Sequence, residues 1–289
     1  MNLLVFGHGT SASHFTRHHG QAFSRIAATH RSLERIGERH GIETLAFDGR
    51  AALADVLAAL AGADALLVSI PPDAVGDPVL AHFATAIADA PKLSRIVYLS
   101  TVGVYGDHGG AWVDEATVPK PISPRSILRL QAERDWLALG TALGKTVHVL
   151  RLGGIYGPGQ NALENMRAGT ARRIVKPGQV FNRIHVEDIA RAIAASFDHA
   201  QGGVCNVTDN EPAPPQDVVT FAAHVLGMPP PPELDFATTA MSAMARSFYG
   251  ENKRVSNQRL RHVLGVELAY PTYREGILAL SQELAPPAR

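Results

Sequence analysis

A glycine-rich segment near the N-terminus has the residue types and spacing of a phosphate-binding loop. Gly7-His8-Gly9-Thr10-Ser11-Ala12 has the pattern G-x-G-x-x-A and directly follows the apolar residues 3–6. In this pattern the first glycine permits a tight turn, the second lets the backbone approach a pyrophosphate, and the small third residue lets helix and strand pack closely. Backbone N–H groups at the helix start attract phosphate, and Thr10 and Ser11 add hydroxyl donors. The segment therefore predicts a dinucleotide site.

The residues after the second apolar run favour NADP over NAD. An NAD site usually has an acid here, which binds the ribose 2′-hydroxyl, but residues 21–33 contain neither Asp nor Glu. Arg31 can instead hold a 2′-phosphate with two hydrogen bonds and stack on adenine, with Thr29 and Ser32 as hydroxyl partners. The alternative is that Arg31 only faces solvent at a helix start. Two further candidate cofactor residues follow later apolar runs, Asp48 and Ser69.

The candidate cofactor residues can act together only if the fold brings the ends of several strands close to one another. The sequence pattern of the first half of the chain predicts such a fold. Short apolar runs alternate with helical runs of about 10–15 residues, which is typical of a parallel, doubly wound α/β sheet with right-handed crossovers. The expected strands are residues 3–6, 23–28, 43–47, 65–70, 95–100 and 146–150. Asp48 follows the third of these strands, where it can contact the adenine amine or cap a turn. The expected helices are residues 11–19, 32–39, 51–61, 79–88 and 124–143.

The second half of the chain has more loop signals and predicts a smaller C-terminal lobe. Proline-rich stretches separate short elements there. We expect a dinucleotide-binding domain over residues 1–154, joined again by 182–208, and a substrate lobe over 155–181 and 209–289. The expected elements of this half are helices at 184–197, 216–226 and 272–284 and a strand at 203–207.

Composition excludes several classes of protein. The 289 residues carry 27 Lys+Arg and 27 Asp+Glu, so the chain lacks the basic excess of a general nucleic-acid binder. No apolar run approaches the ~20 residues that span a bilayer, and the N-terminus lacks the basic start of a signal peptide. Cys205 is the one cysteine, which excludes an internal disulfide and fits a reducing compartment. We expect a cytoplasmic protein with a small-molecule substrate, no nucleic-acid partner and no membrane partner.

The 13 histidines raise the question of a metal site. His14 and His18 have i,i+4 spacing, with His19 beside them, but no H-E-x-x-H or cysteine pattern accompanies them. A solvated helix face is the simpler explanation. The sequence pattern therefore predicts no metal.

Several blocks follow the Gly7 loop in a fixed order. They are YLSTVGVYGD at 98–107, RLGGIYGPG at 151–159, HVEDIA at 185–190, NVTD at 206–209, KR at 253–254 and LG at 264–265. With them, nearly the whole chain resembles the extended short-chain dehydrogenase/reductase family, which includes nucleotide-sugar epimerases and dehydratases. The resemblance implies a Rossmann domain, a small C-terminal substrate lobe and a catalytic centre between them. It also implies a homodimer formed through two helices per subunit, and the broad apolar set within residues 124–143 agrees with this.

One segment departs from the catalytic signature of that family. The resemblance implies Tyr-x-x-x-Lys with an acid four residues after the lysine. Counting back from Glu133 puts Arg129 at the lysine position and Arg125 at the tyrosine position. Arg129 keeps the positive charge and can donate to the ribose hydroxyls, whereas Arg125 stays protonated and cannot act as an acid/base. The chain thus resembles the atypical members of the family, which lack the usual active-site residues.

Four residues remain as candidates for catalysis. Thr101 occupies the Ser/Thr place of the family and can hydrogen-bond a substrate oxygen. Tyr105 is the best remaining phenolic acid/base, although an aromatic in this loop is also typical of a pocket wall. Arg125 and Arg129 share one helical face and favour a carboxylate or phosphate substrate, unless they form surface ion pairs. The resemblance adds Arg183 and Arg246 as candidate substrate-binding residues. Tyr156 and Asn161 lie in a plausible pocket loop and are further candidates, with a structural role as the favoured alternative for Tyr156.

Two functions fit these observations. The first is an atypical NADP-dependent oxidoreductase or epimerase-like enzyme that acts on a small anionic or sugar-derived substrate. The second is a non-catalytic NADP-binding regulator that uses the same site as a sensor. The missing tyrosine favours the regulator, whereas Thr101, the Tyr105 loop and the substrate lobe favour the enzyme, and the fold does not decide between them.

Overall fold

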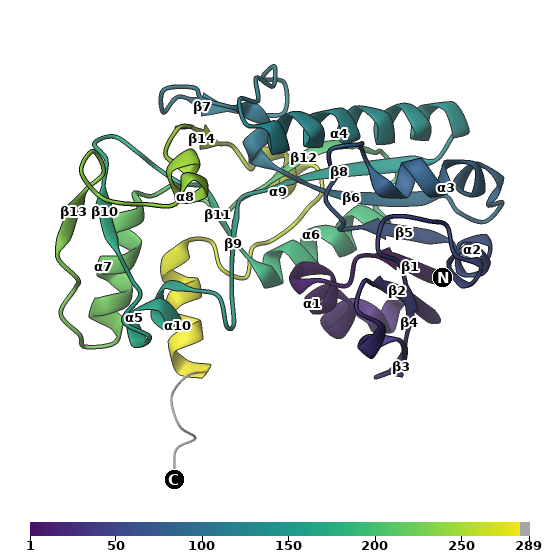
Figure 1. The fold of residues 1–289 in the computed structure, drawn as a ribbon, viewed down its shortest axis with the longest axis horizontal. Helices are drawn as coiled ribbons and strands as arrows, with labels where there is room; N and C mark the ends of the chain where they lie inside the picture. Colours follow the sequence, from purple (N-terminus) through teal and green to yellow (C-terminus); the bar gives the residue numbers. More distant parts are fainter. Residues whose placement is uncertain (284–289) are drawn as a thin grey trace, which may run out of the picture.

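An eight-stranded sheet in the order β12-β8-β6-β5-β1-β2-β4-β3 lies at the centre of the computed structural model, which describes residues 1–283 (Figure 1). Within this sheet β3 pairs antiparallel with β4, and the other neighbours pair parallel. The sheet is the predicted doubly wound Rossmann type. Its strands are β1 Asn2–Phe6, β2 Arg25–His30, β3 Gly37–Arg39, β4 Ile42–Ala46, β5 Ala65–Val68, β6 Arg95–Thr101, β8 Thr146–Leu152 and β12 Gly203–Val207.

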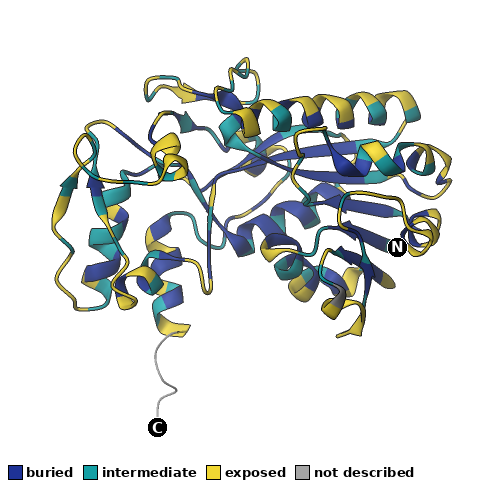
Figure 2. Ribbon diagram, in the orientation of Figure 1, coloured by how far each residue is buried: buried dark blue, intermediate teal, exposed yellow. Residues whose placement is uncertain are grey.

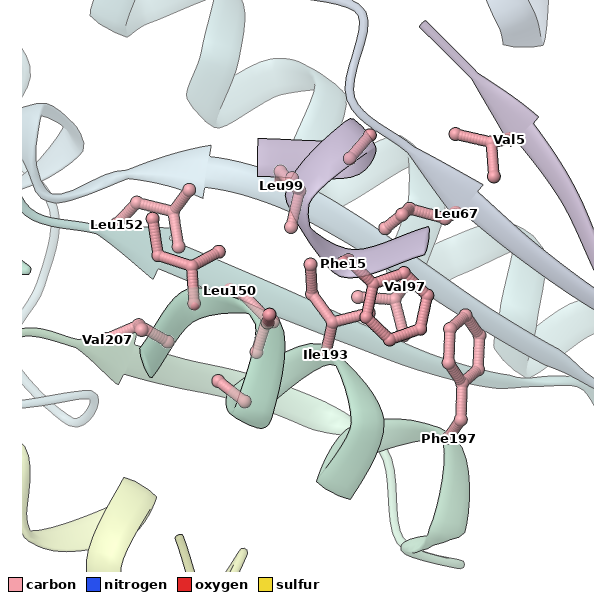
Figure 3. Packing of buried hydrophobic residues seen from close by; sticks show 14 of the residues in the cluster. Val5, Phe15, Leu67, Val97, Leu99, Leu150, Leu152, Ile193, Phe197 and Val207 are labelled. Carbon is pink, nitrogen blue, oxygen red and sulfur yellow. The ribbon is translucent and has the colours of Figure 1, made fainter. Parts of the chain in front are cut away.

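Helices cover both faces of the sheet because its central strands are apolar on both sides. Leu3 and Val5 belong to the core beneath α1 and α6, whereas Leu4 and Phe6 belong to the core beneath α2, α3 and α4. Figure 2 shows the buried strands between the two helical layers, and Figure 3 shows Phe15 of α1 packed with α6 against the sheet. These helices are α1 Thr10–His19, α2 Ala54–Ala61, α3 Pro78–Asp89, α4 Pro124–Leu143 and α6 Val186–Asp198.

The long helix α4 has the bounds that its sequence predicts. The Ser123 hydroxyl accepts from the N–H of Ser126, and Pro124 occupies the first helical position. Gly144 ends the helix in the left-handed conformation with φ 63°. Local signals are therefore sufficient to define both ends of the helix that carries Arg125 and Arg129.

The predicted helix over residues 32–39 is wrong. A 3₁₀ turn, Leu33–Arg35, is followed by the edge strand β3, which pairs with β4. Gly37 has φ 117°, and the turn residues His40 and Gly41 have φ 52° and 74°. A right-handed helix excludes all three conformations. Pairing with β4 therefore overrides the helical composition of this segment.

Two other predicted helices differ at their ends. The helix predicted at 184–197 begins at Val186, because Arg183–His185 forms strand β11 and pairs with β9, Gly154–Tyr156. The helix predicted at 272–284 corresponds to α10, Tyr273–Glu283, and residue 284 lies outside the described residues. The remaining predicted elements of the large domain are present with shifts of a few residues at their ends.

The smaller lobe lies beside one end of the large sheet (Figure 1). Its core contains Leu163 of α5, Ala222 of α7, and Tyr273 and Ile277 of α10. Residues 1–283 contain no helix that is long and apolar enough to cross a membrane. The elements not yet introduced are α5 Ala162–Arg167, α7 Pro215–Val225, α8 Ala243–Phe248, α9 Gln258–His262, β7 Trp112–Val113, β10 Arg173–Val175, β13 Glu233–Asp235 and β14 Arg254–Val255.

Candidate functional site

The Gly7 loop joins β1 to α1 and is held by the ends of the neighbouring strands. Gly7 has φ 89°, and its N–H donates to Thr29 Oγ1 at 2.9 Å. The N–H of His8 donates to the Thr29 carbonyl at 3.0 Å, so the end of β2 fixes the loop. A Cβ on Gly7 would lie 2.7 Å from Cγ1 of Ile70, just beyond β5. Both the backbone conformation and the close approach therefore require glycine.

The N-terminus of α1 has backbone N–H groups that can bind an anion. Gly9 is its N-cap residue, no side chain of the described residues caps it, and its first turn contains no acid. Gly9 and Thr10 are exposed, and a Cβ on Gly9 would meet no atom within 4 Å. Ala12 and Ser11 are buried, and Ala12 packs closely against the sheet. Open donors and the positive helix end fit the pyrophosphate of a dinucleotide.

The end of β2 offers cationic and hydroxyl groups. Thr29 is buried with its hydroxyl engaged by the loop, and His30 Nδ1 accepts from the N–H of Ser32 at 2.9 Å. Arg31 lies between them in sequence and is exposed. Burial above all, and then the charge of His30, lowers the pKa of His8. Arginine rather than His8 therefore supplies the positive charge at this edge of the sheet.

Asp48 and Ser69 have different surroundings. Ser69 follows β5, and its N–H donates to the Phe6 carbonyl at 2.8 Å, which places it beside the glycine-rich loop. Asp48 is exposed, and its Oδ1 accepts from the N–H of Arg50 at 3.0 Å. This contact closes a local turn, the alternative that the sequence left open for Asp48.

Thr101 and Tyr105 follow β6, but their hydroxyl groups differ in exposure. Thr101 is half-buried, and its Oγ1 accepts from the N–H of Gly103 at 3.1 Å to begin a 3₁₀ turn. Tyr105 is fully buried and donates its hydroxyl to Asn206 Oδ1 at 2.8 Å. Burial raises the pKa of Tyr105 above its usual value. Its hydroxyl would have to leave Asn206 and reach solvent before it transferred a proton to a substrate.

Arg125 and Arg129 lie one turn apart on α4 and connect different parts of the molecule. Arg129 Nη1 donates to the Leu99 carbonyl at 2.9 Å and to the Tyr98 hydroxyl at 3.1 Å, so it ties α4 to β6. Arg125 is exposed, and its guanidinium carbon lies 5.9 Å from the ring centroid of Phe248 on α8. Arg129 is thus held beside the strand end, and the exposed guanidinium of Arg125 can pair with an anion next to the lobe.

A buried ionic network beneath this region was not among the predicted site residues. Glu133 of α4 accepts from Ser100 Oγ and from Nε and Nη2 of Arg151, the latter at 3.1 and 2.7 Å. The Arg151 guanidinium carbon also lies 4.8 Å from the ring centroid of Tyr105. The bidentate pair fixes β6, α4 and β8 relative to one another. An acid among apolar helix positions was the sequence signal for it.

Two of the predicted substrate-binding residues have structural partners. Asn161 is the N-cap of α5, where its Oδ1 accepts from the N–H of Glu164 at 3.0 Å. Tyr156 is buried, and its hydroxyl donates to the Thr272 carbonyl at 3.5 Å. Asn161 thus stabilises the start of α5, and Tyr156 links β9 to the segment just before α10.

The two predicted substrate-binding arginines differ in exposure. Arg183 donates from Nη1 to the carbonyls of Phe181 and Ala213, each at 3.0 Å. Arg246 is exposed on α8, and its guanidinium carbon lies 4.9 Å from the ring centroid of Phe236. Arg246 and Arg125 therefore both contact aromatic rings of the lobe and remain open to solvent.

Comparison with protein families agrees with this arrangement. A model of the NAD-dependent epimerase/dehydratase family matches residues 4–208, most of the chain. The matched range includes the Gly7 loop, the turn after β6 and helix α4. The chain belongs to this family.

Three similar proteins cover most of the chain. It is 31% identical over 225 residues to Protein YeeZ of Escherichia coli strain K12, which covers 75% of each chain. It is 28% identical over 218 residues to a 3-diazoavenalumate denitrifying reductase of a Streptomyces species, which covers 68% of each chain. The solved structure of a functionally unknown conserved protein from Silicibacter pomeroyi DSS is 45% identical, covers 99% of both chains and has a TM-score of 0.88.

Membership of the epimerase/dehydratase family confirms the resemblance drawn from the sequence blocks. The replacement of Tyr-x-x-x-Lys by Arg125 and Arg129 stays a prediction, and α4 places the two residues one turn apart as that alignment requires. The family's dinucleotide fits the residues present, because the start of α1 is open and the Gly7 turn is tight.

Proposed function

We propose that this protein binds NADP at the Gly7 loop and acts as an atypical NADP-dependent oxidoreductase or epimerase-like enzyme on a small anionic substrate. The observation that carries the proposal is the uncapped start of α1 beside a β2 end that has Arg31 and no acid. The pyrophosphate would take the open N–H groups of α1 and the hydroxyl of Thr10, and the 2′-phosphate would pair with Arg31.

The groups around the end of β6 support reduction or oxidation of a polar substrate. When bound, NADP(H) supplies the hydride acceptor or donor. Thr101 would hydrogen-bond a substrate oxygen, which is supported by its half-buried position at the end of β6. Arg129, tied to β6, keeps a fixed positive charge beside the same strand end. That charge would stabilise an oxyanion during hydride transfer without the guanidinium losing a proton.

The exposed arginines support a negatively charged substrate. Arg125 and Arg246 are both exposed and lie against aromatic rings of the lobe, and a guanidinium group binds carboxylate or phosphate with two parallel hydrogen bonds. The Streptomyces relative is named a 3-diazoavenalumate denitrifying reductase, and a name ending in -ate denotes an anion as the substrate of that protein. A carboxylated or phosphorylated small molecule, sugar-derived or not, is therefore the class we propose here.

A regulator that only senses NADP is the second candidate. It is favoured by the burial of Tyr105, the phenolic candidate for acid/base catalysis, because its hydroxyl is already donated to Asn206. A sensor would bind NADP and NADPH with different affinities and transfer no hydride. The two candidates share the cofactor site and differ in turnover.

Calorimetric titration with NADP, NADPH, NAD and NADH tests the cofactor site first. We expect NADP(H) to bind, and Arg31→Ala to lower its affinity about 10-fold to 100-fold and to lower NAD affinity less, because NAD lacks the 2′-phosphate. Arg134→Ala removes another exposed arginine, on α4, and should change neither affinity. Failure of all four dinucleotides to bind would overturn the proposal.

Turnover then separates the enzyme from the sensor. Carboxylated and phosphorylated sugars and aromatic acids are screened for substrate-dependent change in NADPH absorbance. Arg125→Ala should raise KM for an anionic substrate, since it removes a charged partner outside the cofactor site. Binding of NADP with no hydride transfer to any of these classes would favour the sensor.

A homodimer through α4 and a cytoplasmic location stay predictions. Ile127 is 52% exposed on α4, whereas Leu130 and Trp136 of the predicted apolar set are buried within the subunit. The surface that α4 can offer a second subunit is therefore narrower than the sequence indicates. Sedimentation of the wild type and of Ile127→Lys tests for such a dimer.

A further inference from the structure

Three histidines of α1 face the start of α6. His14 and His18 are one turn apart, and their ring centroids are 4.3 Å apart. Helices α1 and α6 pack side by side beneath the sheet (Figure 1). This packing brings Glu187, in the first turn of α6, to His14, with 2.9 Å between Glu187 Oε2 and His14 Nε2.

The three side chains are close enough to share one ion. One nitrogen from each of His14 and His18 and a carboxylate oxygen of Glu187 all lie within 4.8 Å of one another. Zinc bonds of ~2.0–2.2 Å to His and carboxylate separate two ligand atoms of one ion by up to about 4 Å. His18 is exposed, so a small rotation of its side chain closes the remaining gap.

The surroundings of Glu187 leave one of its oxygens for a metal. Arg191 Nε contacts Oε1 at 3.3 Å, on the side away from the His14 contact, and the Arg191 side chain is 42% exposed. Such a contact orients a ligating carboxylate without occupying its second oxygen. His19 Nε2 lies 3.9 Å from Oε1 and is a buried nitrogen with no hydrogen-bond partner among the described residues. A buried donor nitrogen therefore also faces this cluster.

We propose that His14, His18 and Glu187 form a site for one divalent transition-metal ion, with Zn²⁺ the best match. Two imidazoles and one carboxylate are a common ligand set for zinc, and water completes the tetrahedron. The site joins the C-terminal half of α1 to α6. Along α1, at 1.5 Å per residue, His14 and His18 lie about 6 and 12 Å from Thr10, so the site does not include the cofactor loop. An ion bound there would fix α1, whose other end carries that loop, to the large core.

Zinc binding to the full, tag-free chain tests the site. The protein is dialysed against a chelator and titrated with ZnCl₂ by calorimetry, and its Tm is measured with zinc and with EDTA. We expect one Zn²⁺ per chain and a higher Tm with zinc, because an ion that binds only the folded state stabilises it. His18→Ala should lower zinc affinity at least about 10-fold and leave the Tm in EDTA unchanged, since His18 is exposed.

Two further variants locate the bound ion. Glu187→Gln keeps the shape of the side chain but removes its charge, and should also weaken zinc binding at least about 10-fold. His224→Ala removes an exposed histidine of α7 and should bind zinc as the wild type does. The proposal is overturned if no zinc binds, if His18→Ala binds as tightly as the wild type, or if His224→Ala loses as much affinity as His18→Ala.

Discussion

At the scale of single residues, Glu133 has the largest predicted effect on stability. Its side chain is 1% exposed and neutralises Arg151, which is 5% exposed. Glu133→Ala leaves the guanidinium buried without its partner, so we expect the free energy of unfolding to fall by about 3–5 kcal/mol. Glu43→Ala breaks the exposed pair with Arg25 and should cost about 1 kcal/mol or less. Urea unfolding measures both variants, and equal losses would contradict the importance of burial.

Asp209 should make stability depend on pH. Burial raises the pKa of this carboxyl from 3.8 to about 8, and its Oδ2 lacks a hydrogen-bond partner among the described residues. Between these two pH values the folded chain holds a proton that the unfolded chain has lost. The contribution of Asp209 to stability is therefore complete below the lower value and is lost as pH rises through the upper one.

The variant Asp209→Asn tests this pH dependence. The amide cannot ionise, so the decline in unfolding free energy between pH 5 and pH 7.5 should be smaller than in the wild type. One proton accounts for at most about 1.4 kcal/mol per pH unit of that difference. Urea titrations at the two pH values measure it. Parallel pH dependences of the two proteins would show that Asp209 is already ionised in the fold.

At the scale of elements, two glycines of the β1–loop–α1 unit should have different effects. Gly7 should be needed for both stability and NADP binding, whereas Gly9 should be needed for NADP binding and not for stability. Gly7→Ala forces φ 89° on alanine and brings its Cβ against Ile70, so we expect a stability loss of about 1–3 kcal/mol together with lost NADP binding. Gly9→Ala meets no protein atom within 4 Å, so its stability should change by less than about 0.5 kcal/mol.

The two glycine variants should both lose NADP affinity and should differ in stability. The methyl group of Gly9→Ala would occupy the open space before the helix N-terminus, where the pyrophosphate is proposed to lie. Affinity measured by calorimetry should therefore fall although the Tm does not. A Gly9→Ala protein that binds NADP as the wild type does would place the pyrophosphate elsewhere.

At the scale of the whole molecule, the folding of residues 4–208, the range matched by the family model, depends on residues that follow this range. Leu260, Val266 and Leu268 lie between α8 and α10 in sequence but are buried in the same core as β1 and α6. A chain of residues 1–208 would expose that core, so we expect it to show no cooperative urea transition. In the full chain, Leu260→Ala should cost about 2–5 kcal/mol, whereas Leu278→Ala, at a 47% exposed position, should cost less than about 0.5 kcal/mol.

Local sequence was sufficient where the deciding interactions span only a few residues. The Gly7 loop and the ends of α4 depend on Gly7, Ser123, Pro124 and Gly144, which act on their immediate neighbours. The alternation of Leu3 to Phe6 between the two cores likewise follows from strand geometry. Residues 32–39 were predicted wrongly because their partner β4 competes with a helical composition.

Tertiary structure alone decided which of the chemically capable side chains remain available. The Tyr105 hydroxyl is donated to Asn206, 101 positions away, and Arg129 is held by a carbonyl of β6. His14 meets Glu187, 173 positions away, although no local motif suggests a common site. The physical reason is that burial and hydrogen-bond partners arise from packing between distant segments. Residue type shows what a side chain can do, whereas packing determines whether its atoms are free to do it.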